Sequence, residues 1–482
     1  MEGGYKQVLT DISQAIGNTP LVRLNRVPEM EGIKCEILIK CEFLNPGGSV
    51  KDRIGKSMVE SAETDGTLKK GDTILEASSG NAGIGIALLA ACKGYNCLIT
   101  MPMKMSEEKV NVLHGLGAST IRTRTSAVFS DPDSHIETCK KIRDTRENHV
   151  ILDQYNNDKN WQAHYNGTGA EIVECVDGKL DYIVVGTGTG GTMTGVAKKV
   201  KETLPDVKIV GVDPYGSILA DPEHPETQDN MPSYAVEGIG YDFVPKNCER
   251  EHVDEWVKVE DKDSFRLAKM ILKYEGMMCG GTTGSNLSGC FKYIRDNDLQ
   301  DNENLRFVVI APDNIRNYMS KHLSDEWCVK KNFIDHEIFY DANHPLCGKT
   351  AEICDLKDIP YYDDRLTVGD ALDIFKRGET IIPLIENGQT KGVLLEDTLL
   401  EAIVKKRLSV LSSASNAITK DFCTLPYNTD LSIVHRMLTK NPSILLEKRD
   451  EDSNKRHLYS ITMHDIVNIF RNKMKEQLLI SY

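Results

Sequence analysis

The sequence predicts an α/β protein that continues into a smaller region with a different pattern. From about residue 70 to residue 315, short β-branched runs alternate with longer helix-like segments, which is typical of a mostly parallel sheet with helices on both faces. The chain has 482 residues, more than one hydrophobic core usually holds. The alternation also ends near residue 325, so we expect at least two domains.

Five apolar runs define the predicted strands, and helix-like segments separate them. The predicted strands are residues 73–77, 97–101, 182–185, 208–212 and 307–311, and the clearest predicted helices are residues 84–92, 107–114 and 193–203. Ligands of such folds bind beyond the carboxyl ends of the parallel strands. The loops that follow these strands are therefore where we look for functional residues.

The composition excludes several classes of protein. Apolar side chains make up 40% of the chain and charged side chains 27%, which is the balance of a globular protein, and the net charge of −14 argues against a nucleic-acid partner. No apolar run is long enough to span a membrane, and the N-terminus resembles neither a signal peptide nor a transit peptide. The 13 cysteines form no C-x-x-C pair. We therefore expect a cytoplasmic protein without disulfides, a metal site or a membrane partner.

The C-terminal region contains two similar units. Residues 366–375 resemble residues 431–438, and residues 392–400 resemble residues 459–467, so each unit is read as helix, strand, strand, helix. Two such units pack on each other because neither buries its apolar face alone. The predicted segments are an α/β body over residues 1–325, a linker over residues 326–354 and the paired repeats over residues 355–482.

A glycine turn in residues 45–53, Asn-Pro-Gly-Gly-Ser-Val-Lys-Asp-Arg, presents Lys51 at the start of a predicted helix. The segment is not a Walker motif, because that motif needs Gly-Lys followed by Ser or Thr. A nucleotide triphosphatase is therefore excluded. Taken alone, Lys51 is more often a solvated surface charge than a catalytic group.

Two loops rich in glycine and hydroxyl groups follow predicted strands and open helices. They are residues 78–83, Ser-Ser-Gly-Asn-Ala-Gly, and residues 186–192, Gly-Thr-Gly-Thr-Gly-Gly-Thr. Backbone N–H groups at such helix starts bind carboxylates and phosphates. Plain N-capping explains the first loop as well, whereas the glycines of the second indicate a phosphate site. The second loop also matches G-x-G-x-x-G, and Asp213 ends the next strand, so a dinucleotide-binding oxidoreductase stays open.

Two further glycine loops are weaker signals. Residues 236–245, Val-Glu-Gly-Ile-Gly-Tyr-Asp-Phe-Val-Pro, and residues 279–285, Cys-Gly-Gly-Thr-Thr-Gly-Ser, both allow the backbone to approach a ligand closely. Neither loop is specific by itself. Together with Lys51 and the other two loops in one α/β body, they predict a ligand site.

Taken together, these motifs resemble the fold-type II enzymes that use pyridoxal 5′-phosphate (PLP), and among them the cystathionine β-synthase family. The resemblance rests on residues 16–22, 40–53, 79–81, 188–192 and 279–282, and it runs in order through most of residues 5–325. The C-terminal repeats resemble the paired CBS domains, or Bateman module, of that family. The resemblance implies a fold-type II catalytic core of two open-sheet lobes, followed by α+β tandem regulatory repeats.

The resemblance implies PLP as the cofactor and Lys51 as the catalytic lysine that forms a Schiff base with it. Asn81 would hydrogen-bond the ring hydroxyl, and Thr282 would face the pyridine nitrogen. Because a neutral hydroxyl does not hold that nitrogen protonated as a carboxylate would, Thr282 favours β-elimination over transamination. The residues implied to hold the phosphate are Gly188, Thr189, Gly190, Gly191 and Thr192.

The implied reaction is a β-replacement in which L-serine and L-homocysteine give L-cystathionine and water, with H₂S-forming side reactions. Lys51 would remove the α-proton and return a proton at the end of the cycle. The family usually has threonine where this chain has Ala82, and the lost hydroxyl bears on the choice of first substrate. The implied substrate residues are Ser78, Ser79, Gln154, Tyr155, Gly238, Gly240 and Tyr241.

The resemblance also bears on regulation and assembly. Thr462 and Asp465 match a Thr-x-x-Asp with which family members hold the ribose of S-adenosylmethionine, whereas the first repeat has Leu395 in place of the threonine. One regulatory site is therefore expected, and a module that only aids dimerisation is an equal alternative. A homodimer is the family norm. No Cys or His precedes Cys35, so we expect no haem.

Three alternative functions remain at this point. A cysteine synthase, acting on O-acetylserine or serine with sulfide, shares the first motifs, although residues 236–245 and the C-terminal repeats favour the cystathionine enzyme. A dinucleotide-binding oxidoreductase leaves Lys51 and Thr282 unexplained. A protein that only senses an adenosyl ligand explains the last quarter of the chain alone.

Overall fold

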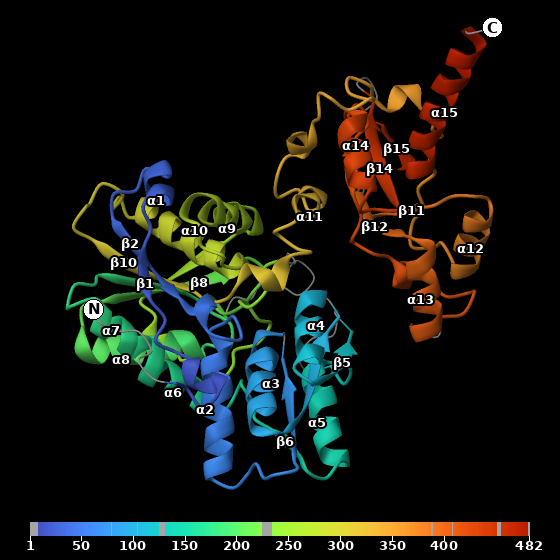
Figure 1. Ribbon diagram of the computed structural model, residues 1–482. Coiled ribbons are helices and arrows are strands. Elements are labelled where there is room, and N and C mark those ends of the chain that lie inside the picture. Colours follow the sequence, from blue (N-terminus) through green and yellow to red (C-terminus); the bar gives the residue numbers. More distant parts are fainter. Residues whose placement is uncertain are drawn as a thin grey trace. The chain divides into compact units, whose positions relative to one another are not determined.

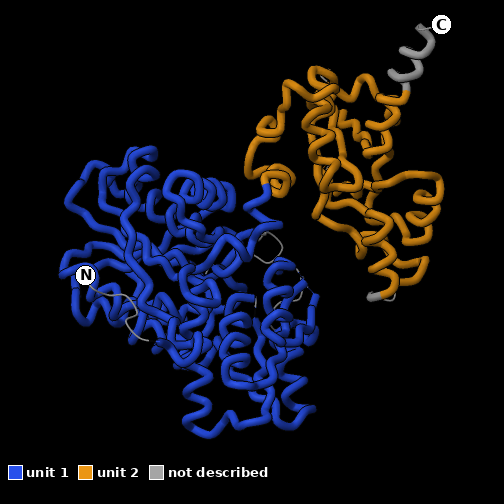
Figure 2. Tube along the Cα trace, in the orientation of Figure 1, with its two compact units in different colours: residues 1–324 blue, residues 325–482 orange. Residues whose placement is uncertain are grey.

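The computed structural model describes residues 8–78, 80–103, 105–124, 131–223, 234–386, 389–406, 408–450 and 455–480 (Figure 1). The chain divides into two compact units, Met1–Ser324 and Asp325–Tyr482 (Figure 2). Each unit has its own buried apolar clusters, and each is described by itself below.

The first unit contains a four-stranded parallel sheet with the strand order β5-β4-β3-β6. Apolar side chains alternate between its two faces, as a doubly covered parallel sheet requires. Ile74 and Ile99 pack with α2, α3 and α4, whereas Leu75 and Leu98 pack with α5. The elements are α2 (Lys51–Thr64), β3 (Thr73–Ala77), α3 (Asn81–Lys93), β4 (Asn96–Pro102), α4 (Glu107–Gly115), β5 (Ser119–Thr123), α5 (His135–Thr145) and β6 (His149–Ile151).

The first unit also contains a six-stranded sheet with the order β1-β2-β10-β7-β8-β9, in which only β1 is antiparallel to its neighbour. Val184 and Val309 face α9 and α10, whereas Ile183 and Val308 face α7 and α8. The strands are β1 (Leu21–Arg23), β2 (Glu36–Cys41), β7 (Tyr182–Gly186), β8 (Lys208–Pro214), β9 (Glu255–Val259) and β10 (Arg306–Ala311). The helices are α1 (Arg26–Met30), α6 (Lys159–Ala163), α7 (Ala170–Cys175), α8 (Gly191–Thr203), α9 (Asp261–Glu275) and α10 (Gly281–Asp296), and a π-helical turn, η3 (His164–Gly169), joins α6 to α7.

The second unit repeats the order helix, strand, strand, helix. The first set is α12 (Val368–Lys376), β11 (Ile382–Glu386), β12 (Gln389–Leu394) and α13 (Glu396–Lys406). The second is α14 (Leu431–Leu438), β14 (Ser443–Arg449), β15 (Arg456–Thr462) and α15 (Met463–Ile480), and β13 (Thr424–Pro426) pairs parallel with β14. The strands of each set pair antiparallel, so the two predicted α+β repeats have the same local architecture.

Residues 326–354, which the sequence predicts as a linker, pack into the second unit. The segment contains most of α11 (Asp325–Lys330) and two short 3₁₀ turns. Its residues Val329, Leu346 and Ala351 are buried in the same cluster as Val434 and Ile461. An apolar residue buried in this way fixes the segment to the repeats. None of the described helices is both long enough and apolar enough to cross a membrane.

A buried ionic network holds the start of α2 against the six-stranded sheet. The Arg53 guanidinium donates to both oxygens of Glu42 at 2.7 and 2.9 Å and to Glu171 at 2.7 Å. The Lys40 ammonium donates to the other Glu171 oxygen at 2.6 Å. Burial opposes ionisation of Glu171, but Arg53 and Lys40 lower the pKa of this carboxyl to about 2. The network therefore stays charged at neutral pH and fixes the helix that begins at Lys51.

We predict that Arg53→Ala destabilises the first unit strongly. The change leaves the fully buried Glu42 carboxylate without its guanidinium, and breaking a buried pair in this way costs roughly 3–5 kcal/mol. Chemical denaturation measures the loss. The control is Lys34→Ala, because Lys34 pairs with Asp301 on the surface and the loss of such an exposed pair should have little effect on stability. Equal effects of the two substitutions would contradict the prediction.

Candidate active site

A cavity opens between the two sheets of the first unit, at the carboxyl ends of β7 and β10. It encloses about 740 Å³, including the solvent at its mouth. Ten of the residues that the sequence singles out line it: Lys51, Asn81, Gln154, Gly188, Thr189, Gly190, Thr192, Gly238, Tyr241 and Thr282. Four others, Ser78, Tyr155, Gly191 and Gly240, lie outside the lining, and Ser79 lies outside the described residues.

Lys51 is the first residue of α2, and its amine lies in a poorly solvated environment. Burial lowers the pKa of Lys51 to about 8, although the nearby Asp313 carboxylate acts in the opposite direction. A lysine with this pKa is unprotonated far more often than a solvated lysine at neutral pH. It can therefore act as a nucleophile or as a base.

The turn before Lys51 is held by the carboxylate of Asp52. The Gly47 N–H donates to Asp52 Oδ2 at 2.6 Å. A Cβ at Gly47 would lie 2.5 Å from the other oxygen of the same carboxylate, so no larger residue fits there. Gly48 follows with a φ of +85°, which glycine adopts without strain. These two glycines explain why the sequence places Gly-Gly just before the lysine.

The loop at the start of α8 is enclosed so closely that its glycines are required. Added Cβ atoms at Gly190 and Gly191 would overlap Cys248 and Asn160, and one at Gly188 would lie 2.7 Å from the Gly238 carbonyl oxygen. The loop opens a 13-residue helix, so its N–H groups and the helix dipole favour an anion there. Thr189 and Thr192 add hydroxyl groups at the cavity wall.

The geometry does not favour the dinucleotide alternative for this loop. That alternative needs the acidic residue at the end of the next strand to be free to bind a ribose. Asp213 is instead fully buried, and its carboxylate pairs with Lys258 at 2.9 Å. It also accepts the Ala220 N–H at 3.1 Å.

Ser78 acts as a structural cap in this conformation. Its hydroxyl oxygen accepts the Gly80 N–H at 3.1 Å and the Gly83 N–H at 2.9 Å, and its side chain is fully buried. The N-capping interpretation of residues 78–83 therefore describes Ser78. Among the described residues of this loop, Asn81 and Ala82 line the cavity.

A buried carboxylate that the sequence did not single out positions Gln154. Glu76, in β3, accepts the backbone N–H groups of Asp153 and Gln154 at 2.9 and 3.0 Å. Burial raises the pKa of Glu76 to about 8. Its bonds support Asp153 at a φ of +57°, and the Gln154 side-chain amide donates to the Ala77 carbonyl at 2.8 Å. Nothing in the strand pattern distinguishes this Glu from a surface residue.

Two aromatic residues, Tyr155 and Phe243, lie outside the cavity lining and pack against Tyr241. Tyr155 is buried, with its ring centroid 5.8 Å from that of Tyr241 and 5.5 Å from that of Phe243. Tyr241 lines the cavity, and Tyr155 supports it through an edge-to-face contact. Tyr155 therefore contributes through packing in this conformation.

Two charged residues missed by the sequence analysis also line the cavity or support it. Lys109, on the buried face of α4, lines the cavity and donates to Glu237 at 2.6 Å. Burial would raise the pKa of Glu237, but Lys109 and Lys321 hold it below its usual range. Glu237 also offers its backbone carbonyl to the Thr282 hydroxyl at 2.7 Å. This pair links α4 to the glycine loop at residues 238–240.

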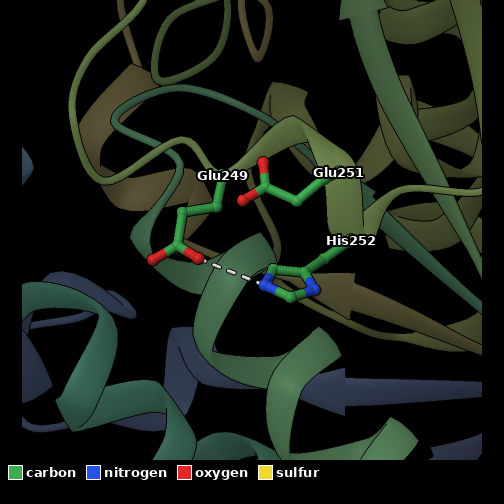
Figure 3. A group of neighbouring side chains, drawn as sticks. All are labelled: Glu249, Glu251 and His252. Carbon is green, nitrogen blue, oxygen red and sulfur yellow. Dashed lines mark hydrogen bonds and ion pairs between the residues drawn. The ribbon is translucent and has the colours of Figure 1, made fainter.

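A second group of ligand-type side chains lies away from the cavity, around η4 (Arg250–His252). Glu249, Glu251 and His252 come within metal-binding distance of one another (Figure 3). However, Glu249 already pairs with Lys198 at 2.7 Å and contacts His252 Nε2 at 3.1 Å. An ion-pair network accounts for the group without a metal.

In the second unit, Thr462 and Asp465 bond to each other at the start of α15. Asp465 Oδ2 accepts the Thr462 N–H at 2.8 Å and the Thr462 hydroxyl at 2.7 Å. This is the geometry of a helix start in which an acidic side chain caps a preceding N–H group. The pair is therefore ordered without a ligand.

Comparisons with known proteins agree with the motifs. Residues 12–313 match the family described as Pyridoxal-phosphate dependent enzyme. The cystathionine beta-synthase of Apis mellifera is 40% identical over 93% of this chain and 89% of its own length, and that of Mus musculus is 52% identical over 69% of this chain and 58% of its own length. The solved structure of the O-acetylserine dependent cystathionine beta-synthase from Helicobacter pylori has 30% identity and a TM-score of 0.60, and it covers 65% of this chain and 98% of its own.

These similarities confirm the resemblance, the fold-type II core and the PLP cofactor that the sequence predicts. They extend through both units, because the Apis mellifera protein matches nearly the whole chain. The chain belongs to the cystathionine β-synthase family of pyridoxal-phosphate-dependent enzymes.

Proposed function

We propose that this enzyme condenses L-serine with L-homocysteine to give L-cystathionine and water, in the cavity at Lys51. The single observation that carries the proposal is a buried lysine amine facing a glycine-built anion cradle across one cavity. The names of the relatives support the choice of substrates.

The residues around the cavity fit PLP. The glycines at the start of α8 let the loop pack against Cys248, Asn160 and the Gly238 carbonyl, and α8 directs its N-terminal dipole toward this loop, where a phosphate would bind. Lys51, with its lowered pKa, would carry the cofactor. Asn81 and Thr282 also line the cavity and would contact the pyridine ring of PLP. PLP, when bound, supplies an electron sink for negative charge at the substrate α-carbon.

The chain's own residues would then bind the substrates and move protons. Gln154, held by Glu76 and by the Ala77 carbonyl, would bind the substrate carboxylate together with the backbone after β3. Lys51 Nζ, whose pKa is lowered to about 8 by burial and which therefore loses its proton more readily than a solvated lysine, would take the α-proton and later return it. Tyr241 and the loop of Gly238 and Gly240 would border the second substrate. Ser78 would act indirectly, by accepting N–H groups at the start of α3. Tyr155 would also act indirectly, by packing against the Tyr241 ring.

Lys51→Ala tests the central residue. Because Lys51 would carry the cofactor and move the proton, we expect the visible absorbance of bound PLP to disappear and turnover to fall by about 10²–10⁴-fold. Absorbance spectra and initial rates measure the two effects. The control is Lys56→Ala on the same helix, because the Lys56 amine lies outside the cavity lining and donates to the Ser13 carbonyl at 3.3 Å, so this variant should keep both properties. A yellow, active Lys51→Ala protein would contradict the proposal.

The choice of substrates has a second candidate, because the similar Helicobacter pylori enzyme is O-acetylserine dependent. Product analysis by mass spectrometry separates the possibilities. We expect cystathionine from serine plus homocysteine at a higher kcat/KM than cystathionine from O-acetylserine plus homocysteine, or cysteine from O-acetylserine plus sulfide. A higher kcat/KM for either O-acetylserine reaction would make O-acetylserine, and not serine, the first substrate in the proposal. Ala82, which lines the cavity, is the first position to vary in that case.

We further propose that the second unit is a paired CBS-domain module that binds S-adenosylmethionine beside Thr462 and Asp465, and that the enzyme works as a cytoplasmic homodimer. The repeated architecture supports a paired module, and Thr462 and Asp465 match the Thr-x-x-Asp with which family members hold the ribose. Calorimetric titration of the full-length protein with S-adenosylmethionine should release heat, and Asp465→Ala should abolish it. The absence of heat and of any rate change would favour a module that only aids dimerisation, and light scattering measures the dimer.

A further inference from the structure

The orientation of the Asn81 side chain is fixed by two neighbours outside α3. Asn81 Nδ2 donates to Asp313 Oδ2 at 2.7 Å. On the other side of the amide, Asn317 Nδ2 donates to Asn81 Oδ1 at 3.2 Å. The two ends of an amide have nearly the same shape, so hydrogen-bond partners decide which end points where.

Asp313 admits only one of the two orientations. An ionised carboxylate accepts hydrogen bonds and donates none, so it must face the Asn81 nitrogen. Asp313 is fully buried, and burial raises its pKa, but the Lys109 ammonium and the bonds from Tyr318 and Asn81 favour the ionised form. The Tyr318 hydroxyl donates to the same Oδ2 atom.

Asn317 imposes the same orientation independently. Its own backbone is held in place, because the Ser106 hydroxyl donates to the Asn317 carbonyl at 2.7 Å and the Asn317 N–H bonds the Asn314 carbonyl at 3.3 Å. From this position its side-chain N–H group reaches an oxygen on Asn81. A flipped Asn81 amide would set two N–H groups against each other there.

The nitrogen end of Asn81 is the end that faces the ligand cavity. Asn81 and Asp313 both line the cavity, whereas Asn317 does not. The Asn81 nitrogen carries two hydrogens, and Asp313 takes one of them. A ligand in the cavity would take the second hydrogen in place of the Tyr318 hydroxyl, which also interacts with the Asn81 side chain. In addition, Asp313 Oδ1 is buried without a hydrogen-bond partner among the described residues.

We propose that Asp313 and Asn317 are positioning residues that lock the Asn81 amide so that it presents an N–H group, and not its carbonyl, to the ring oxygen of PLP. The site thereby selects the deprotonated ring oxygen, which can only accept a hydrogen bond. The inference rests on the proposed placement of PLP at Lys51. It adds two residues, both from the segment after β10, that act on the cofactor through Asn81.

Asp313→Asn tests the lock, because the new amide can turn its own N–H group toward Asn81. Losing a hydrogen bond to a charged oxygen corresponds to a weakening of roughly ten- to a hundredfold. We therefore expect the dissociation constant for PLP to rise by that factor and the pH midpoint of the absorbance of bound PLP to change, because the substitution also removes a charge that acts on Lys51. Equilibrium dialysis of PLP and absorbance against pH measure these changes. The matched control is Asp213→Asn, another fully buried Asp outside the cavity, which should change neither.

The double variant Asp313→Asn with Asn317→Asp separates orientation from stability. The exchange restores a donor and an acceptor around Asn81 but with the amide reversed. We expect the thermal stability of the PLP-free protein to recover toward that of the unaltered chain, while PLP affinity and the pH midpoint stay altered. Recovery of PLP affinity in the double variant would overturn the proposal, as would an unaltered PLP affinity in Asp313→Asn.

A third variant covers a failure of Asp313→Asn to fold. Asn317→Ala removes only the donor to Asn81 Oδ1 and keeps the Asp313 charge, so it should weaken PLP binding by a smaller factor and move the pH midpoint upward. No shift in a folded Asn317→Ala protein would overturn the role of Asn317. None of these measurements uses serine or homocysteine, so they stand apart from the substrate proposal. Failure of the unaltered protein to bind PLP at Lys51 would instead refute the site.

Discussion

The function of the first unit depends on the ion pairs that Arg53 makes with the carboxylates of Glu42 and Glu171. These charges are taken out of water, and they are stable there only because each has a partner in good geometry. Their effect is to fix the first turn of α2 against the six-stranded sheet. Lys51 precedes Arg53 by two residues, so its amine is held at the cavity wall, where burial lowers its pKa.

The cavity is assembled from parts that are each rigid for a separate reason. Glycines at the start of α8 allow the chain to pass close to Asn160 and Cys248, and Glu76 pins the backbone of Gln154. Asp313 orients the Asn81 amide. Preorganised groups of this kind cost little reorganisation when a ligand binds, which favours both affinity and catalysis. The same buried charges make the site sensitive to single substitutions.

Sequence reasoning found the strands and glycine loops because their signals are local. The apolar runs at residues 73–77 and 307–311 are buried on both faces, whereas β5 is mostly half-buried with the sequence Ser-Thr-Ile-Arg-Thr and β6 has only three residues, so neither has a clear apolar run. Glu76, Lys109 and Asp313 were missed as site residues for a different reason. Each has a partner that is 77 or more residues away in sequence, and nothing beside them in the chain marks them as buried.

The central claim is that Lys51, among the lysines of the cavity, carries the cofactor. Among the described residues, Lys109 is the other lysine that lines the cavity, so the two can be told apart directly. Borohydride reduction of the PLP-loaded enzyme, followed by peptide mapping by mass spectrometry, identifies the modified lysine. The account predicts the pyridoxyl group on Lys51 alone. A pyridoxyl group on Lys109, or on a lysine outside the cavity, would contradict it.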